Sequence, residues 1–179
     1  AYTFDYTHDK VGNMELNVEV QATLNGAQKV YKGVLKLTYV TPEMVTKVVI
    51  DGTHYNDYVT GYYGGNVGNF TKMVGDKNVK VEVVKDEITS ETLESCSLLI
   101  ISAPAKKSGT ANAGEYKTSH FSDEFINTVK DYTDRGGTLI VCGIADYQDS
   151  TECQTATEMN KLLNAIGATT TLNSDEAYD

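Results

Sequence analysis

Hydrophobic and polar residues alternate over residues 1–41, and this pattern predicts antiparallel β-strands. Leu16, Val18 and Val20 share one strand face, and aliphatic residues recur from Val30 to Leu37 on the return. Asn-Gly at 25–26 separates the two runs and is a strong short signal for a β-hairpin. The segment is either a complete small β-module or the last strands of a β-sandwich.

From Val45 onward, hydrophobic strands alternate with helical segments. The central strands are apolar on both faces, which is typical of a parallel sheet covered by helices on both sides. The expected fold is α/β, a doubly wound and mostly parallel sheet over residues 44–179 with a small antiparallel β-module over residues 1–43. Pro42 marks the junction, because proline stops strand pairing. Strands are expected at 45–51, 79–84, 97–102, 138–143 and 168–172.

Helices are expected over 122–135 and 151–167, with a short one over 89–95. The longer two carry hydrophobic stripes at helical spacing and end at glycine, in Gly136-Gly137 and at Gly167. Thr151 and Gln154 have the spacing of a capping box. The stripes predict core packing and consist of Phe121, Phe125, Val129 and Tyr132, then Ala156, Met159, Leu162, Leu163 and Ile166.

Four glycines lie in a further helical pattern over 59–73. Each interior glycine costs up to about 1 kcal/mol relative to alanine, so close packing of this helix on the sheet, or close approach to a ligand, is expected to compensate. The stretch GGNVGN lacks Gly-Lys-Ser/Thr and does not match G-x-G-x-x-G, so it is not a phosphate loop. The glycines are Gly61, Gly64, Gly65 and Gly68.

Composition narrows the function classes. The 179 residues carry a formal net charge of −10, which argues against nucleic-acid binding. No apolar run is long enough to span a bilayer, and the chain shows no signal peptide. Cys96, Cys142 and Cys153 form neither a disulfide framework nor a zinc pattern, and no cofactor is expected. Because the first residue is Ala1, the chain is expected to be part of a longer protein.

Candidate site residues follow the predicted strands at their carboxyl ends, where open parallel sheets bind ligands. His120 precedes a helix and is expected near the same edge. Structural roles are the alternative: Asp51-Gly52 turns the chain, His54 is hydrogen-bonded in its loop, and Asn56 or Asp57 caps a helix. The predicted ligand-binding residues are Asp51, His54, Asn56, Asp57, Ser102, Asp146 and Tyr147, with Cys142 at the same edge.

Residues 47–176 resemble the class I glutamine-amidotransferase-like superfamily. The resemblance lies in KVVIDGTHYNDYVTGYYGGNVGNFTKMV, CSLLIISAPAKKSG, FSDEFINTVKDYTDRGGTLIVCGIADYQD and MNKLLNAIGAT. The Asp-Arg-Gly-Gly element between helix and strand is typical of the branch without amidotransferase activity. The resemblance implies an extracellular or cell-surface protein of a Gram-positive bacterium, with neighbouring domains as partners. Residues 1–41 resemble the tail of an immunoglobulin-like domain.

The catalytic branch of that superfamily has a nucleophilic cysteine in G-x-C-x-G, with a histidine and a glutamate downstream. Cys142 in LIVCGIADY lies near the corresponding turn, but Ile144 replaces the second glycine and no histidine follows His120. These departures weigh against Cys142 as a nucleophile, because a thiol needs a base or a positive field to ionise.

Two alternative functions are therefore considered, of which the first is expected. The first is a noncatalytic ligand-binding or scaffold domain, in which tyrosines such as Tyr55 and Tyr147 contact a small molecule, sugar or peptide. The second is a hydrolase with His54 as general base, assisted by Asp51 or Asp146, acting on water or Cys142. Backbone N–H groups around Gly52 or Gly143 would then stabilise developing negative charge.

Overall fold

The computed structural model describes residues 5–54, 59, 65–75, 77–102, 120–143 and 155–173. Contacts between residues divide the chain into two compact units, Ala1–Val45 and Thr46–Asp179.

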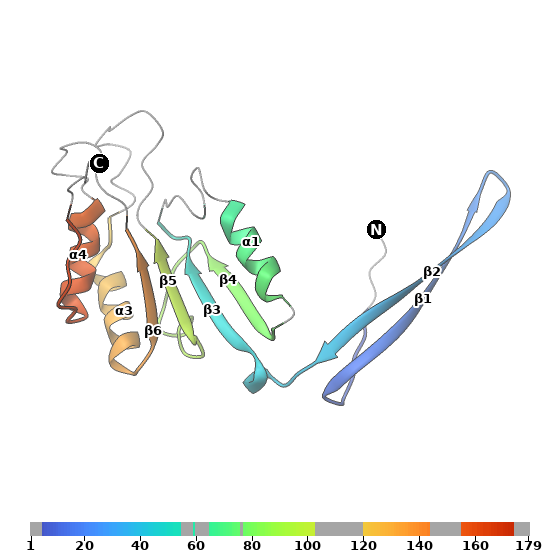
Figure 1. Ribbon diagram of the computed structural model, residues 1–179, viewed down its shortest axis with the longest axis horizontal. Helices are drawn as coiled ribbons and strands as arrows, with labels where there is room; N and C mark the ends of the chain where they lie inside the picture. Colours follow the sequence, from blue (N-terminus) through green and yellow to red (C-terminus); the bar gives the residue numbers. More distant parts are fainter. Residues whose placement is uncertain are drawn as a thin grey trace, which may run out of the picture. The chain divides into compact units, whose positions relative to one another are not determined.

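The first unit is a β-hairpin of two antiparallel strands, β1 (Gly12–Leu24) and β2 (Ala27–Tyr39) (Figure 1). Asn25 and Gly26 form its turn with φ values of 50° and 76°. Positive φ at both central residues is the requirement of a type I′ turn, whose twist matches that of the flanking strands. The predicted hairpin and its Asn-Gly turn are confirmed.

The hairpin has one aliphatic face and one with charged pairs. On the aliphatic face Leu16 is paired with Leu35 in the antiparallel register. On the other face Glu19 lies directly opposite Lys32, with Oε2 and Nζ 3.1 Å apart. Exposed cross-strand pairs of this kind help to set register and contribute about 0.2–1 kcal/mol each.

The second unit contains a parallel sheet of four strands in the order β4-β3-β5-β6 (Figure 1). A short 3₁₀ turn, η1 (Pro42–Met44), comes before it in the chain. The predicted α/β fold is confirmed. The chain runs from β3 to β4 on one side and then returns to β5 on the other, so the order reverses between β3 and β5. The strands are β3 (Thr46–Asp51), β4 (Val79–Val84), β5 (Leu98–Ser102) and β6 (Thr138–Cys142).

The core lies between one face of this sheet and two helices, α3 (Asp123–Asp134) and α4 (Thr155–Ala165). The sheet contributes Val49 and its neighbours Leu99 and Ile101, all fully buried. Burying each such side chain stabilises the fold by roughly 1.5–3 kcal/mol. The predicted stripes supply the other side: Phe121, Phe125, Val129, Tyr132, Ala156, Met159 and Leu162 are buried, and Leu163 and Ile166 are half-buried.

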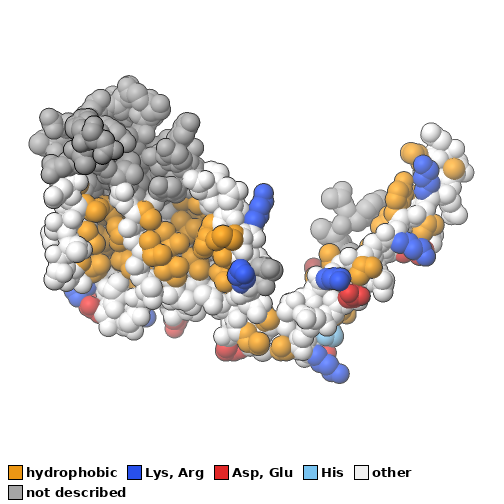
Figure 2. Space-filling view, viewed as in Figure 1, with side chains coloured by type: hydrophobic (Ala, Val, Ile, Leu, Met, Phe, Trp, Pro, Cys, Tyr) orange, Lys and Arg blue, Asp and Glu red, His pale blue; other side chains and the backbone are white. Residues whose placement is uncertain are grey.

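The opposite face of the sheet is also aliphatic. Figure 2 shows hydrophobic side chains gathered over the strands on the visible side of the α/β unit. Ile140 of β6, paired in register with Ile100, is 45% exposed. Helix α1 (Gly65–Val74) contacts β4 and leaves Met73 exposed. The described helices therefore cover the two faces unequally.

Both long helices end as their glycines predict. In α3 the Gly136 N–H donates to the Thr133 carbonyl and the Gly137 N–H to the Tyr132 carbonyl, with φ of 90° at Gly136. This paired pattern is a Schellman motif, and it satisfies carbonyls that the helix leaves open. The end of α4 repeats it, with φ of 75° at Gly167. The predicted capping box at 151–154 lies outside the described residues.

The segment predicted as a short helix over 89–95 is a series of turns. The Leu93 N–H donates to the Thr89 carbonyl, but the Glu94 N–H donates three residues back, to Glu91. The Thr89 hydroxyl accepts the Thr92 N–H at 3.2 Å, and the Thr92 hydroxyl accepts the Thr89 N–H at 3.4 Å. These local bonds satisfy the backbone without a regular helical ladder.

The strand predicted over 168–172 is also absent from the described sheet. The side chain of Asn160 instead bonds the backbone of Leu172, accepting from its N–H and donating to its carbonyl, both at 2.8 Å. An amide side chain thus supplies the partners that a neighbouring strand would otherwise provide.

The expectation that glycines bring a helix close to the sheet is wrong for Gly65 and Gly68. A Cβ built on either residue has no described atom within 4 Å. Both therefore lie on an open side of α1, where a side chain would fit. Gly61 and Gly64 lie outside the described residues.

Candidate functional site

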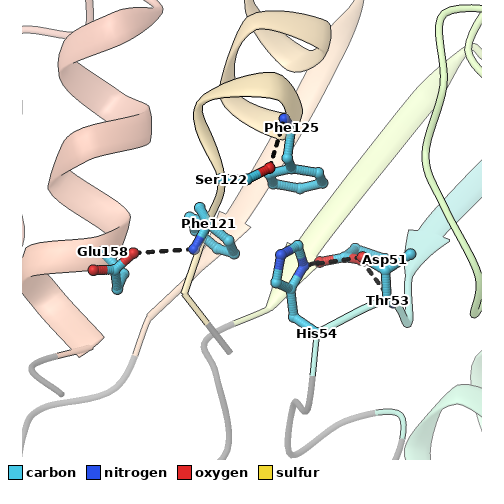
Figure 3. A network of polar contacts seen from close by, with 7 residues as sticks. All are labelled: Asp51, Thr53, His54, Phe121, Ser122, Phe125 and Glu158. Carbon is cyan, nitrogen blue, oxygen red and sulfur yellow. Dashed lines mark hydrogen bonds and ion pairs between the residues drawn. The ribbon is translucent and has the colours of Figure 1, made fainter. Parts of the chain in front are cut away.

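A buried acid–histidine pair lies where β3 ends. Asp51 is fully buried and His54 is 8% exposed, and Asp51 Oδ2 lies 2.7 Å from His54 Nδ1 (Figure 3). An ionised carboxylate only accepts hydrogen bonds, so Nδ1 of the imidazole is the donor. In the neutral ring this tautomer leaves the lone pair on Nε2.

Thr53 completes the network and fixes the acid. Its backbone N–H and its hydroxyl both donate to Asp51 Oδ1, at 2.9 and 2.7 Å. The same hydroxyl oxygen lies 3.0 Å from His54 Nδ1. Both carboxylate oxygens of Asp51 thus have partners in the three residues that follow it, which offsets the cost of burying the charge.

The start of α3 encloses the imidazole. The His54 ring meets Phe121 and Phe125 edge-on, with centroid separations of 4.7 and 4.5 Å. Figure 3 shows His54 between Asp51 and the two phenylalanine side chains. Aromatic packing on one side and a charged hydrogen bond on the other hold the ring in one orientation.

A second histidine–carboxylate pair joins the residues just before α3 to α4. Glu158, only 5% exposed, accepts the Phe121 N–H at 3.0 Å, and its Oε1 lies 2.9 Å from His120 Nδ1 and 2.6 Å from Lys161 Nζ. Burial raises the pKa of Glu158, but the hydrogen bonds from Lys161, His120 and the Phe121 N–H outweigh it and hold that pKa below its ordinary value. This pair therefore anchors the segment that carries Phe121.

A cavity of about 200 Å³ lies beside His54. It is formed by the residues that follow β3, the residues that follow β4 and the first turn of α3. This is the carboxyl edge of the sheet, next to the point where the strand order reverses, and open α/β sheets bind ligands there. The described residues that line it are Thr53, His54, Asp86, Glu87, Ile88, Ser122, Glu124 and Phe125.

The structure brings together only some of the predicted residues. Asp51 and His54 are in direct contact, and Ser102 ends β5 in register with Cys142 of β6, at the same edge. Neither Ser102 nor Cys142 lines the cavity. The remaining predicted site residues, Asn56, Asp57, Asp146 and Tyr147, lie outside the described part of the chain.

Cys142 lies on the other face of the sheet from Asp51. The register aligns Cys142 with Ser102, whereas Asp51 follows Ile50, which is aligned with Ile100. Because successive strand residues point to opposite faces, the thiol and the Asp51 carboxylate diverge. Burial also raises the pKa of the Cys142 thiol, which reduces the thiolate needed for attack.

Gly52 is held against the end of β4. Its N–H donates to the Val84 carbonyl at 2.7 Å, and a Cβ at this position would lie 2.8 Å from the same oxygen. The expectation that this N–H stabilises charge on a substrate is therefore wrong, because the sheet already uses it. Gly143 has a different neighbour, since a Cβ there would lie 2.5 Å from Leu172 Cδ1.

Sequence reasoning missed two of the three walls of the cavity. Glu87 follows β4, and Ser122 and Glu124 begin α3, far from His54 in the chain. The signal was present for Glu87, because the rule that points to strand ends applies to β4 as well. For α3, the sequence pattern predicted only that a helix begins at residue 122, and no local signal indicated that its first turn borders His54.

Among the described residues, no group of three or more histidine, cysteine, aspartate or glutamate side chains is arranged to hold a metal ion. No helix in this part of the chain is long and apolar enough to cross a membrane. No family model and no curated protein matches the chain. The amidotransferase-like and immunoglobulin-like resemblances thus stay predictions, and the site has to be interpreted from its geometry.

Proposed function

We propose that the α/β unit is a noncatalytic ligand-binding domain whose site is the cavity beside His54. The observation that carries this proposal is the buried Asp51–Thr53–His54 network, of which Thr53 and His54 line the cavity at the carboxyl edge of the sheet. A buried ionisable pair is expensive to fold and is commonly retained at functional sites.

Two features favour binding over catalysis. The thiol of Cys142 lies on the opposite sheet face from Asp51, and burial raises its pKa. The Gly52 N–H, one of the two expected donors for an oxyanion, is bonded to Val84. The nucleophile and one charge-stabilising group of the hydrolase hypothesis thus lose support, while the histidine remains in place.

A hydrolase that activates water is the second candidate. It is favoured by the 2.7 Å contact between Asp51 and His54 Nδ1, because a general base is commonly oriented by a carboxylate at its other nitrogen. In this form Cys142 has no role, and His54 Nε2 takes the proton from water.

The setting implied by the resemblance is part of the same proposal. The domain would belong to a larger extracellular or cell-surface protein and would position neighbouring domains of that chain. Its support is the resemblance of residues 47–176 alone.

A fragment screen by NMR tests the proposal. The chain is titrated with small amines, acids, sugars and dipeptides while the resonances of Thr53, His54 and Phe125 are followed. We expect saturable shifts at these three residues for at least one compound class. Saturable binding confined to other parts of the chain would overturn the proposal.

Variants separate binding from hydrolysis. His54→Gln removes the ring at the cavity, and His120→Gln removes a histidine from the other carboxylate pair as a matched control. With p-nitrophenyl acetate as probe, we expect equal hydrolysis by the parent chain and both variants. Hydrolysis that falls at least tenfold only in His54→Gln would instead establish the hydrolase candidate.

A further inference from the structure

The cavity beside His54 is bounded by acidic residues on two sides. Asp86 and Glu87 lie in the segment after β4, and Glu124 lies in the first turn of α3. Among the described residues that line it, none is a lysine or an arginine. The described lining residues therefore carry net negative charge, and the formal net charge of −10 on the whole chain has the same sign.

The start of α3 does not offset this field. A helix N-terminus normally attracts anions through its unsatisfied N–H groups. Here the Ser122 hydroxyl already accepts the Phe125 N–H at 3.1 Å, and Asp123 and Glu124 add two carboxylates to the first turn. An anionic ligand would meet repulsion at this wall.

The remaining walls suit the apolar part of a small cation. Ile88 and Phe125 line the cavity and are 3% and 7% exposed. An aromatic ring attracts an ammonium or guanidinium group, by about 0.5–1 kcal/mol at an exposed site and more when water is excluded. A lining that combines carboxylates with apolar side chains suits a charged head on a short aliphatic stem.

We propose that the cavity binds a compact organic cation, a primary ammonium or guanidinium group on a short aliphatic chain. This inference rests on the proposed function, since it takes the cavity to be the ligand site. The volume of about 200 Å³ is below the roughly 300–1,000 Å³ usual for drug-sized ligands, so only a small head group enters. A free amine and a lysine or arginine side chain of a peptide share this chemistry.

Four probes of matched size test the inference. n-Butylammonium, n-butylguanidinium, n-butanol and butyrate are titrated at constant ionic strength, with the ring C–H resonances of His54 and the amides of Glu87 and Phe125 as reporters. We expect saturable shifts with both cations, and at least tenfold weaker binding of butanol and butyrate.

Charge variants locate the interaction. Glu87→Gln and Glu124→Gln each remove one carboxylate from the cavity wall and should weaken cation binding by about two- to fivefold, the range of exposed ion pairs. Glu94→Gln removes the same charge from an exposed turn residue that does not line the cavity, and it is the matched control. Equal weakening by all three variants would show a diffuse charge effect and overturn the inference.

The outcomes separate this inference from the proposed function. If butanol or butyrate binds and the cations do not, the cavity is a ligand site of another class and only the inference fails. If none of the probes shifts the reporters, the inference also fails, and the wider fragment screen decides the proposed function. Acetyl-lysine-methylamide distinguishes the sources, because tighter binding than butylammonium indicates a peptide side chain.

Discussion

Tyr132 lies directly across Gly137, so closely that a Cβ on the glycine would fall 2.4 Å from the Cζ atom of the ring. The ring is held there by its hydroxyl, which accepts the Thr138 N–H at 3.1 Å and donates to the Thr138 carbonyl at 3.0 Å. Glycine at 137 is therefore a packing requirement of the link between α3 and β6, in addition to its part in ending the helix.

Gly137→Ala should destabilise the chain by roughly 1–3 kcal/mol, the usual range for forcing a methyl group into a filled space. The ring cannot move away without breaking its bonds to Thr138. Urea denaturation followed by circular dichroism measures the loss. The control is Gly68→Ala, where a Cβ meets open space within a helix. It should stabilise the chain by about 0.5–1 kcal/mol, and a loss there would contradict the described packing.

Gly52→Ala should be more damaging than Gly143→Ala. At Gly52 the new methyl group meets the Val84 carbonyl oxygen at 2.8 Å, and that oxygen is fixed in the sheet. At Gly143 it meets the far end of the Leu172 side chain, which can rotate away. We expect thermal unfolding to show a cost of about 2–4 kcal/mol for the first variant and under about 1 kcal/mol for the second. Equal costs would refute this reasoning.

Asp51→Asn should change the protonation pattern of His54. An asparagine can still accept from Thr53 through its oxygen, but its NH₂ group then faces Nδ1 as a second donor. The imidazole should shift its proton to Nε2, at a cost in stability of about 1–3 kcal/mol for the rearranged buried bonds. Long-range ¹H–¹⁵N spectra of the ring report the tautomer. A ring that keeps its proton on Nδ1 in the variant would contradict the assignment.

Tyr132 should make stability fall at high pH. Burial raises the pKa of its hydroxyl from about 10 to about 12. Between these two values the folded chain holds more protons than the unfolded chain, so stability decreases as pH rises. The contribution of the protonated Tyr132 hydroxyl to folding stability is complete below pH 10 and is lost as pH rises through 12. Melting temperatures at pH 8 to 11.5 should decline more steeply for the parent chain than for Tyr132→Phe, and parallel declines would exclude the effect.

Glu158 should contribute to stability above its unfolded pKa and lose that contribution in acid. Its folded pKa is below the ordinary value. Between these two pKa values the folded chain therefore binds fewer protons than the unfolded chain, and stability decreases as pH falls. Glu158→Gln should therefore be less stable than the parent chain at pH 7, with a difference that shrinks as pH falls below about 4.5. Denaturation midpoints at pH 7 and pH 3.5 measure it. A constant difference would show that the carboxylate charge has no part.

Local signals in the sequence predicted the local structure well. The positive φ values at Asn25 and Gly26, and the glycine ends of both long helices, depend on only a few neighbouring residues. The strand expected over 168–172 failed for a nonlocal reason, because Asn160 takes the backbone bonds of Leu172. Threonine-rich composition favours a strand, but it does not reveal a competing partner in a preceding helix.

The candidate site was predictable only in part for the same reason. Asp51 and His54 are three residues apart, and the edge rule for parallel sheets pointed to both. Enclosure of His54 by Phe121 and Phe125 depends on how α3 packs on the sheet. A helical stripe shows that these residues are buried, but not that their rings border an ionisable group.

The bond between the Gly52 N–H and the Val84 carbonyl also bears on the thermodynamics of recognition. It ties the ends of β3 and β4 together at the base of two cavity walls, and the Phe121 N–H bond to Glu158 fastens the third. All three walls are thus braced before any ligand arrives. Association would therefore require little ordering of these described walls, and a small ligand would retain more of its contact energy as affinity.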